Sequence, residues 1–178
     1  MTDTPAALYL KDVPEQFQKL KDLADRALAQ VRDDDLFTVL DAESNSLAVL
    51  MQHVGGNLRS RFTAFLTSDG EKPDRNREAE LSVAPRTTRL DLEARWETGW
   101  GALFVALAEL AEEDLTRTVA IRAEPHTVVR AIDRSLTHVA YHVGQIVLLA
   151  RHSVGGAWQT LSIPRGGSQA LNERMFGR

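Results

Sequence analysis

Apolar residues recur at helical spacing in four long segments of the chain, and turn-rich connections separate these segments. The first predicted helix opens at Asp12, where Pro14 in the first turn and Glu15 three residues on form a helix-start signal. The aspartates at 33–35 end it. The apolar stripe of this helix is Phe17, Leu20, Ala24, Ala27 and Val31.

The second predicted helix starts at Ser44 or Asn45 and ends before the turn at residues 68–70. Gly55 and Gly56 lie in its middle, where each glycine costs up to about 1 kcal/mol relative to alanine. We therefore expect a neighbouring helix to cross closely there. Asn57, one residue further on, either lines a pocket or bonds to a loop.

The third predicted helix begins near Thr88, with Asp91 placed to complete a capping box. It carries Trp96 and Trp100 four residues apart on one face, a spacing that favours packing in the core. The spacing leaves open that the two tryptophans wall an apolar pocket instead.

Between residues 112 and 127, β-forming and polar residues alternate, which predicts two short strands or an extended crossover. The fourth helix is predicted from Val128 to His152, and a short last helix over residues 168–176. We interpret the glycine-rich loop around Arg165 as a conformational cap at the mouth of a site. The fold class predicted from these patterns is all-α, in a single domain of residues 1–178.

Composition excludes several classes of function. A net charge of −4 and an isoelectric point of about 5.7 argue against a nucleic-acid partner. The segment Arg59–Glu80 holds five basic and five acidic residues, which is typical of a salt-bridged, solvated surface, although one or two of its arginines can still face a pocket. The absence of a signal segment and of a long apolar run predicts a cytoplasmic protein without membrane contact.

Two histidines suggest metal chemistry. His138 and His142 lie four residues apart on one helix face, so their Cβ atoms are roughly 5–6 Å apart. The chain has no cysteine, so any ion must be held by nitrogen and oxygen ligands. Two imidazoles on an apolar face need partners, and one shared cation would serve both. The spacing leaves open that they are hydrogen-bonded core histidines, as we expect for His126 and His152.

Three sequence blocks resemble the DinB/YfiT-like superfamily, in a branch without an assigned function. They are NSLAVLMQHVGGNLRSRFTAFLTSDGEKPDRNRE, SLTHVAYHVGQIVLLAR and WQTLSIPRGGSQALN, and they span most of Asn45–Asn172. The resemblance implies an up-down-down-up four-helix bundle. It also implies a divalent metal ion, zinc, nickel or iron, bound by His53, His138 and His142, and a homodimer.

Relatives in that superfamily include thiol S-transferases that use low-molecular-weight thiols such as bacillithiol, a mycothiol-dependent isomerase and proteins described as metal-dependent hydrolases. The resemblance thus implies an enzyme whose ion activates a small thiol or water toward a small electrophilic substrate. The stretch HVAYH lacks the glutamate of HExxH metalloproteases, which disfavours peptide hydrolysis. Tyr141 and Gln145 neighbour the ligands in sequence, and Gln145 is better placed on the metal-bearing face; either residue orients a ligand or simply lies between helices. The alternative function is a non-catalytic, metal-bound dimeric helical module in stress response.

Overall fold

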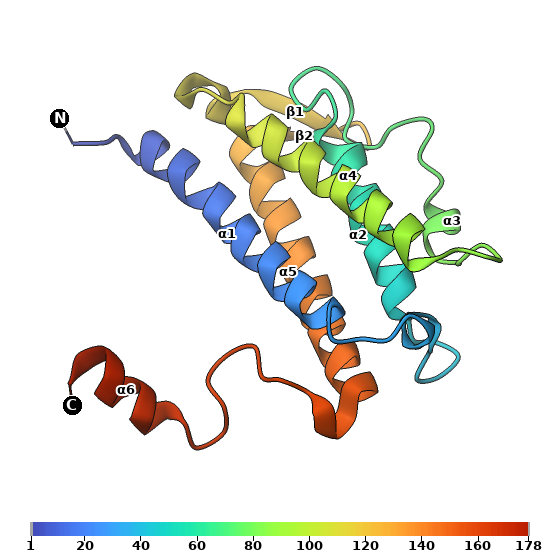
Figure 1. Ribbon diagram of the computed structural model, residues 1–178. Helices are drawn as coiled ribbons and strands as arrows, with labels where there is room; N and C mark the ends of the chain where they lie inside the picture. Colours follow the sequence, from blue (N-terminus) through green and yellow to red (C-terminus); the bar gives the residue numbers. More distant parts are fainter. Residues whose placement is uncertain (1, 178) are drawn as a thin grey trace.

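Four long helices dominate the computed structural model, which describes residues 2–177 (Figure 1). They are α1 (Pro5–Leu28), α2 (Leu47–Phe62), α4 (Arg89–Ala108) and α5 (Val128–Val154). Helix α1 lies beside α5, and α2 lies beside α4 (Figure 1). The shorter elements are η1 (Asp34–Phe37), α3 (Arg77–Glu80), η2 (Glu112–Thr116), β1 (Thr118–Ile121), β2 (Glu124–Thr127), η3 (Gly155–Ala157) and α6 (Ser168–Phe176). The predicted mainly helical fold is confirmed.

Helix α1 begins seven residues earlier than the sequence pattern predicts, at Pro5 instead of Asp12. The Thr4 hydroxyl caps it by accepting a hydrogen bond from the Ala7 amide, 3.0 Å away. Pro14 therefore lies inside the helix, where its ring removes one backbone hydrogen bond. Val13 and Phe17 on either side of it are buried, and their packing outweighs that loss.

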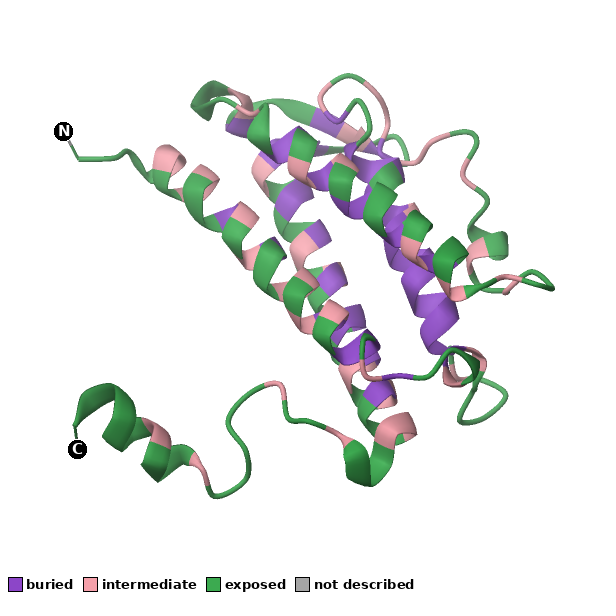
Figure 2. Cartoon of the chain, viewed as in Figure 1, coloured by how far each residue is buried: buried purple, intermediate pink, exposed green. Residues whose placement is uncertain are grey.

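Helix α2 is buried along nearly its whole length, whereas α1 carries a single buried stripe (Figure 2). The N-cap of α2 is Ser46, close to the predicted start. The helix ends at Phe62, however, and does not reach the turn at residues 68–70. The chain leaves the helix at Thr63, whose backbone is extended, and Ala64 follows in a left-handed conformation with φ of 49°. The following segment can then fold back over α2.

The glycines of α2 lie where α4 crosses it, as the sequence predicts. A Cβ atom added to Gly55 would lie 2.7 Å from the Arg95 carbonyl oxygen, and one added to Gly99 would lie 2.3 Å from the Gly55 carbonyl oxygen. Helix α4 opens at Thr88 with the predicted capping box to Asp91. The backbones of α2 and α4 thus touch at a point where no larger residue fits.

Trp96 and Trp100 belong to the core, which confirms the packing interpretation. Both are at most 2% exposed, and the ring centroids of Trp100 and Phe17 lie 6.4 Å apart in an edge-on arrangement. The Trp96 indole N–H donates to the Asp25 carboxylate at 2.8 Å. This aromatic cluster joins α4 to α1.

The two predicted strands form an antiparallel hairpin in which Val119 pairs with His126. Its turn lies at Arg122 and Ala123, both with positive φ. Asp69 stabilises this turn by accepting hydrogen bonds from both turn amides, at 2.8 and 2.7 Å. The hairpin is thereby tied to the segment that follows α2.

His126 is buried, as predicted for a core histidine, but the same prediction for His152 is wrong. His152 lies exposed in the last turn of α5, where a side chain able to carry positive charge suits the helix dipole. Within residues 2–177, no helix combines the length and apolar character needed to cross a bilayer.

Candidate metal centre

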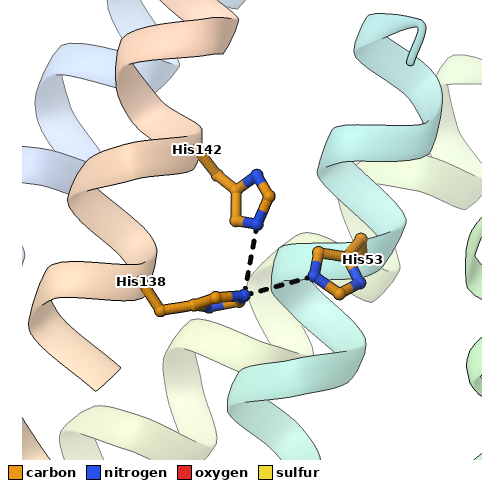
Figure 3. A group of neighbouring side chains, drawn as sticks. All are labelled: His53, His138 and His142. Atoms are coloured by element: carbon orange, nitrogen blue, oxygen red, sulfur yellow. Dashed lines mark hydrogen bonds between the residues drawn. The ribbon is translucent and has the colours of Figure 1, made fainter. Parts of the chain in front are cut away.

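Three histidine side chains from two helices converge on one point (Figure 3). His53 comes from the middle of α2, and His138 and His142 come from successive turns of α5. The Nε2 atom of His138 lies 3.3 Å from Nε2 of His53 and 3.2 Å from Nε2 of His142. One nitrogen from each ring lies within 4.8 Å of the other two.

These separations fit a shared metal ion. Two nitrogens that each lie 2.0–2.1 Å from a tetrahedral ion are about 3.3–3.4 Å apart. Without a cation, three Nε2 atoms facing one another would have to share protons or oppose their lone pairs. The three histidines can therefore hold a metal ion. They are the same three residues that the resemblance of the sequence blocks implies as metal ligands.

Outer partners orient two of the three rings. The Nδ1 atom of His53 lies 3.0 Å from Oε2 of Glu80, and Nδ1 of His142 lies 2.7 Å from Oε1 of Gln145. Because a carboxylate and an amide oxygen can only accept hydrogen bonds, both Nδ1 atoms carry the proton. The lone pair on each Nε2 is then free for a ligand bond, an arrangement typical of metal-binding histidines.

His138 has a different environment. Its Nδ1 atom is buried and has no hydrogen-bond partner among residues 2–177. Burial lowers the pKa of His138 to about 3, and the charges of His142, His53, Arg61 and Arg75 act in the same direction. Burial also lowers the pKa of His142. Both rings are neutral near pH 7, which is the form that binds metal.

The Glu80 carboxylate is itself held in place by Arg75. The guanidinium donates from Nε to Oε1 at 2.8 Å and from Nη2 to Oε2 at 2.7 Å. Burial alone would raise the pKa of Glu80, but the hydrogen bonds from Arg75 and His53 outweigh it and bring the pKa below its usual value. Glu80 therefore stays ionised beside His53.

Gly56 provides the space for that carboxylate. A Cβ atom at residue 56 would lie 2.5 Å from Oε1 of Glu80, closer than any such contact allows. The second glycine of the α2 pair thus serves the metal centre, while Gly55 serves the helix crossing.

The sequence pattern missed Glu80 and Arg75. The sequence predicts that the segment 59–80 is a salt-bridged, solvated surface. The ion pairs of Arg75 are present, but its side chain is buried, with only 4% exposed. Of the two residues that the sequence offers beside the ligands, Gln145 is the one that contacts the outer nitrogen of His142. Tyr141 is 65% exposed and meets the His142 ring edge-on, with 5.0 Å between centroids.

Two further predictions concern the surroundings of the site. Asn57 is buried one turn beyond His53. The loop around Arg165 does not extend toward the histidines, since the preceding Gln159 and Leu161 are hydrogen-bonded to Gln30 and Arg26 at the end of α1. These contacts hold the segment before Arg165 at the C-terminal end of α1, away from the histidines (Figure 1). The interpretation of Arg165 as a cap at the mouth of the site is therefore wrong.

A cavity of about 540 Å³ lies beside the centre, between α2, α4 and the segment that contains α3. Its lining includes Gly56, Arg59, Arg75, Glu80 and Arg95. Two arginines of the segment 59–80 thus face a pocket, as the sequence left open. Glu80 lines this cavity and also contacts His53, whereas none of the three histidines belongs to the lining.

Residues 4–167 match the model of the family described as "Protein of unknown function (DUF1572)". The chain belongs to this family. The match includes every residue of the metal centre, from His53 to Gln145, and DUF1572 as described carries no activity that could be transferred. No curated protein and no solved structure matches the chain at a significant level. The function of this DUF1572 member must therefore be argued from its own site.

Proposed function

We propose that this protein is a metal-dependent enzyme of the DinB/YfiT-like type, in which His53, His138 and His142 hold a divalent ion. The observation that carries the proposal is the convergence of three Nε2 atoms, with Glu80 and Gln145 behind two of the rings. An ion in this position would act as a Lewis acid toward a water or thiol at an open coordination position.

The arrangement of the long helices supports the relationship to the DinB type. Helices α1 and α5 run in one direction, and α2 and α4 run in the other (Figure 1). This order is the one that an up-down-down-up four-helix bundle requires, with the histidines on the second and fourth long helices, and we propose that topology for the protein. The match to DUF1572 by itself does not link the protein to the DinB/YfiT-like superfamily.

The ligand set favours activation of a small nucleophile. Three neutral imidazoles leave the charge of a divalent ion uncompensated, which strengthens its pull on a bound water or thiol. The protein's own residues have two tasks: Glu80 and Gln145 hold the ring tautomers, and Arg75 keeps Glu80 ionised. We propose transfer of a low-molecular-weight thiol such as bacillithiol to a small electrophile, or hydrolysis of that electrophile.

The choice of metal follows from the nitrogen ligands. Imidazole suits zinc, nickel and iron, and the affinity of a site for nickel and zinc exceeds that for iron. We therefore propose zinc or nickel first and iron next.

The experiment measures consumption of a thiol and of monobromobimane with and without added metal. Wild type should show metal-dependent turnover, and His138→Ala should lose it. His152→Ala is the matched control, because this exposed histidine lies on the same helix away from the site. Equal rates with and without metal, in wild type and His138→Ala alike, would contradict the proposal.

A second candidate function is a non-catalytic, metal-bound dimer. The observation that favours it is the C-terminal helix α6, which extends away from the other helices and buries none of its residues (Figures 1 and 2). Met175 and Phe176 on it are 63% and 64% exposed, and a second copy of the chain would cover them. Light scattering on the full chain and on Met175→Ser/Phe176→Ser tests the dimer. A dimer in the first and a monomer in the second, together with equal thiol consumption with and without metal, would support this candidate.

A further inference from the structure

The cavity between α2, α4 and the segment that contains α3 is large enough for a small molecule. Its volume of about 540 Å³ falls within the range that is typical of small-molecule pockets. Gly55, Gly56 and Ala94 leave this space open, since each of these lining residues has either no side chain or only a methyl group. The space is distinct from the metal centre, because none of the three histidines lines it.

The wall of the cavity that residues 72–80 form is held firmly against α2. Gln52 is buried and donates hydrogen bonds from its side-chain amide to the carbonyl oxygens of Glu80 and Ser82, at 2.8 and 2.7 Å. Arg75 lies in the same wall and is fixed by its two hydrogen bonds to Glu80. The cavity is therefore preformed, which lowers the cost of ordering it around a ligand.

Positive charge is in excess along the lining. The charged lining residues are four cations and two acids: Arg59, Lys72, Arg75, Arg95, Asp74 and Glu80. Both acids are already paired, because Asp74 lies 2.9 Å from Arg59 and Glu80 lies 2.7 Å from Arg75. The two cations that remain are Lys72 and Arg95.

Lys72 and Arg95 have only neutral partners. Nη1 of Arg95 donates to the side-chain oxygen of Gln52 at 3.1 Å, and Nζ of Lys72 donates to the main-chain carbonyl of Asp69 at 2.6 Å. Neither cation forms an ion pair with a carboxylate within residues 2–177. Burial lowers the pKa of Lys72, and the charges of Asp69 and Asp74 offset this effect only in part. Both side chains can therefore still accept an anionic partner.

The hydroxyl groups of the lining have less to offer a ligand. Ser60 donates its proton to the Gly70 carbonyl at 2.9 Å, and Thr98 donates its proton to the Ala94 carbonyl at 2.7 Å. Each of these protons is thus used within the chain. An ammonium and a guanidinium each carry several N–H groups, so the two cations keep donors for a ligand. The chemistry of the cavity therefore favours an anion over a neutral polar molecule.

We propose that this cavity binds a small molecule that carries carboxylate or phosphate groups, and that Lys72 and Arg95 recognise those groups. A guanidinium matches two oxygens of such a group, and an ammonium supplies a compact positive charge. A ligand of this kind would compensate the two cations that the chain leaves without a carboxylate. The proposal goes beyond the metal function and does not depend on it.

The test is calorimetric titration of the full chain with inorganic pyrophosphate and, separately, with citrate, at constant ionic strength. Any bound metal ion is first removed with a chelator and dialysis, so that neither anion can bind through a metal. Wild type, Lys72→Gln, Arg95→Gln and Arg77→Gln are compared. Arg77→Gln is the matched control, because Arg77 is an exposed cation of the same segment that does not line the cavity.

Wild type and Arg77→Gln should bind at least one of the two anions with equal affinity. Lys72→Gln and Arg95→Gln should each weaken that binding by about ten-fold or more, the usual effect of losing charged hydrogen bonds. Binding of pyrophosphate alone would assign a phosphorylated ligand, and binding of citrate alone a carboxylate ligand. Absence of binding to wild type, or affinities in Lys72→Gln and Arg95→Gln equal to that of Arg77→Gln, would overturn the proposal.

Discussion

The Nδ1 atom of His53 lies 3.0 Å from Oε2 of Glu80. This contact joins a helix that is buried along most of its length to a short helix in an otherwise irregular segment. Through Glu80 it also links the metal centre to Arg75. The orientation of one ligand therefore depends on a segment that contributes no ligand itself.

Glu80→Gln should weaken metal binding by about 10- to 100-fold, the usual effect of removing an outer partner of a ligating histidine. The amide can rotate its NH₂ group toward Nδ1 and so no longer fixes the tautomer, and it removes one of the two carboxylates that pair with Arg75. Competition with a chromophoric zinc chelator measures the change. Glu78→Gln, an exposed neighbour on α3, should bind zinc as wild type does; equal losses in both variants would remove the specific role of Glu80.

Gly99→Ala should destabilise the protein by about 1–3 kcal/mol, the cost of overpacking a tight contact. The added Cβ atom would lie 2.3 Å from the Gly55 carbonyl oxygen, which is backbone and cannot rotate away. Gly101→Ala on the same helix meets nothing within 4 Å and should stabilise by about 0.5–1 kcal/mol through helix propensity. Urea unfolding of both variants checks the opposite signs; an unchanged or increased stability of Gly99→Ala would contradict the close crossing.

Acid should destabilise the metal-free protein through His138. Burial lowers the pKa of this histidine from 6.5 to about 3, so below pH 6.5 the unfolded chain takes up a proton that the folded chain does not. The free energy of unfolding then falls as the pH falls through this window, because the unfolded state binds more protons. Chemical unfolding at about pH 7 and about pH 5 should show a smaller difference for His138→Gln than for wild type. An identical difference in both proteins would contradict a buried neutral His138.

Much of the fold could be predicted from local pattern. The capping box at Thr88, the hairpin and the glycine crossing all follow from short-range signals, and the structure contains each of them. The predicted start of α1 was wrong because Thr4-Pro5 and Asp12-Val13-Pro14 both resemble a helix start. Only the packing of the whole helix distinguishes the two.

The candidate site was predictable only in part. The four-residue spacing of His138 and His142 indicated that these two side chains share a ligand. The assignment of His53 as the third metal ligand depended on the resemblance of the surrounding sequence to a known superfamily. Glu80 could not be identified because its role depends on a long-range contact that leaves no periodic pattern. A pairing of Gly56 with a distant carboxylate is a relationship that spacing along the chain cannot indicate.

The most direct test of the account is the metal content of the untagged protein. Elemental analysis should find one equivalent of a divalent ion in wild type and in His152→Ala, and much less in His53→Ala. The zinc-loaded wild type should also melt at a higher temperature than its chelator-treated form, since a ligand of the folded state stabilises it. No ion in the wild type even after incubation with zinc, nickel or iron, or an unchanged content in His53→Ala, would contradict the three-histidine centre.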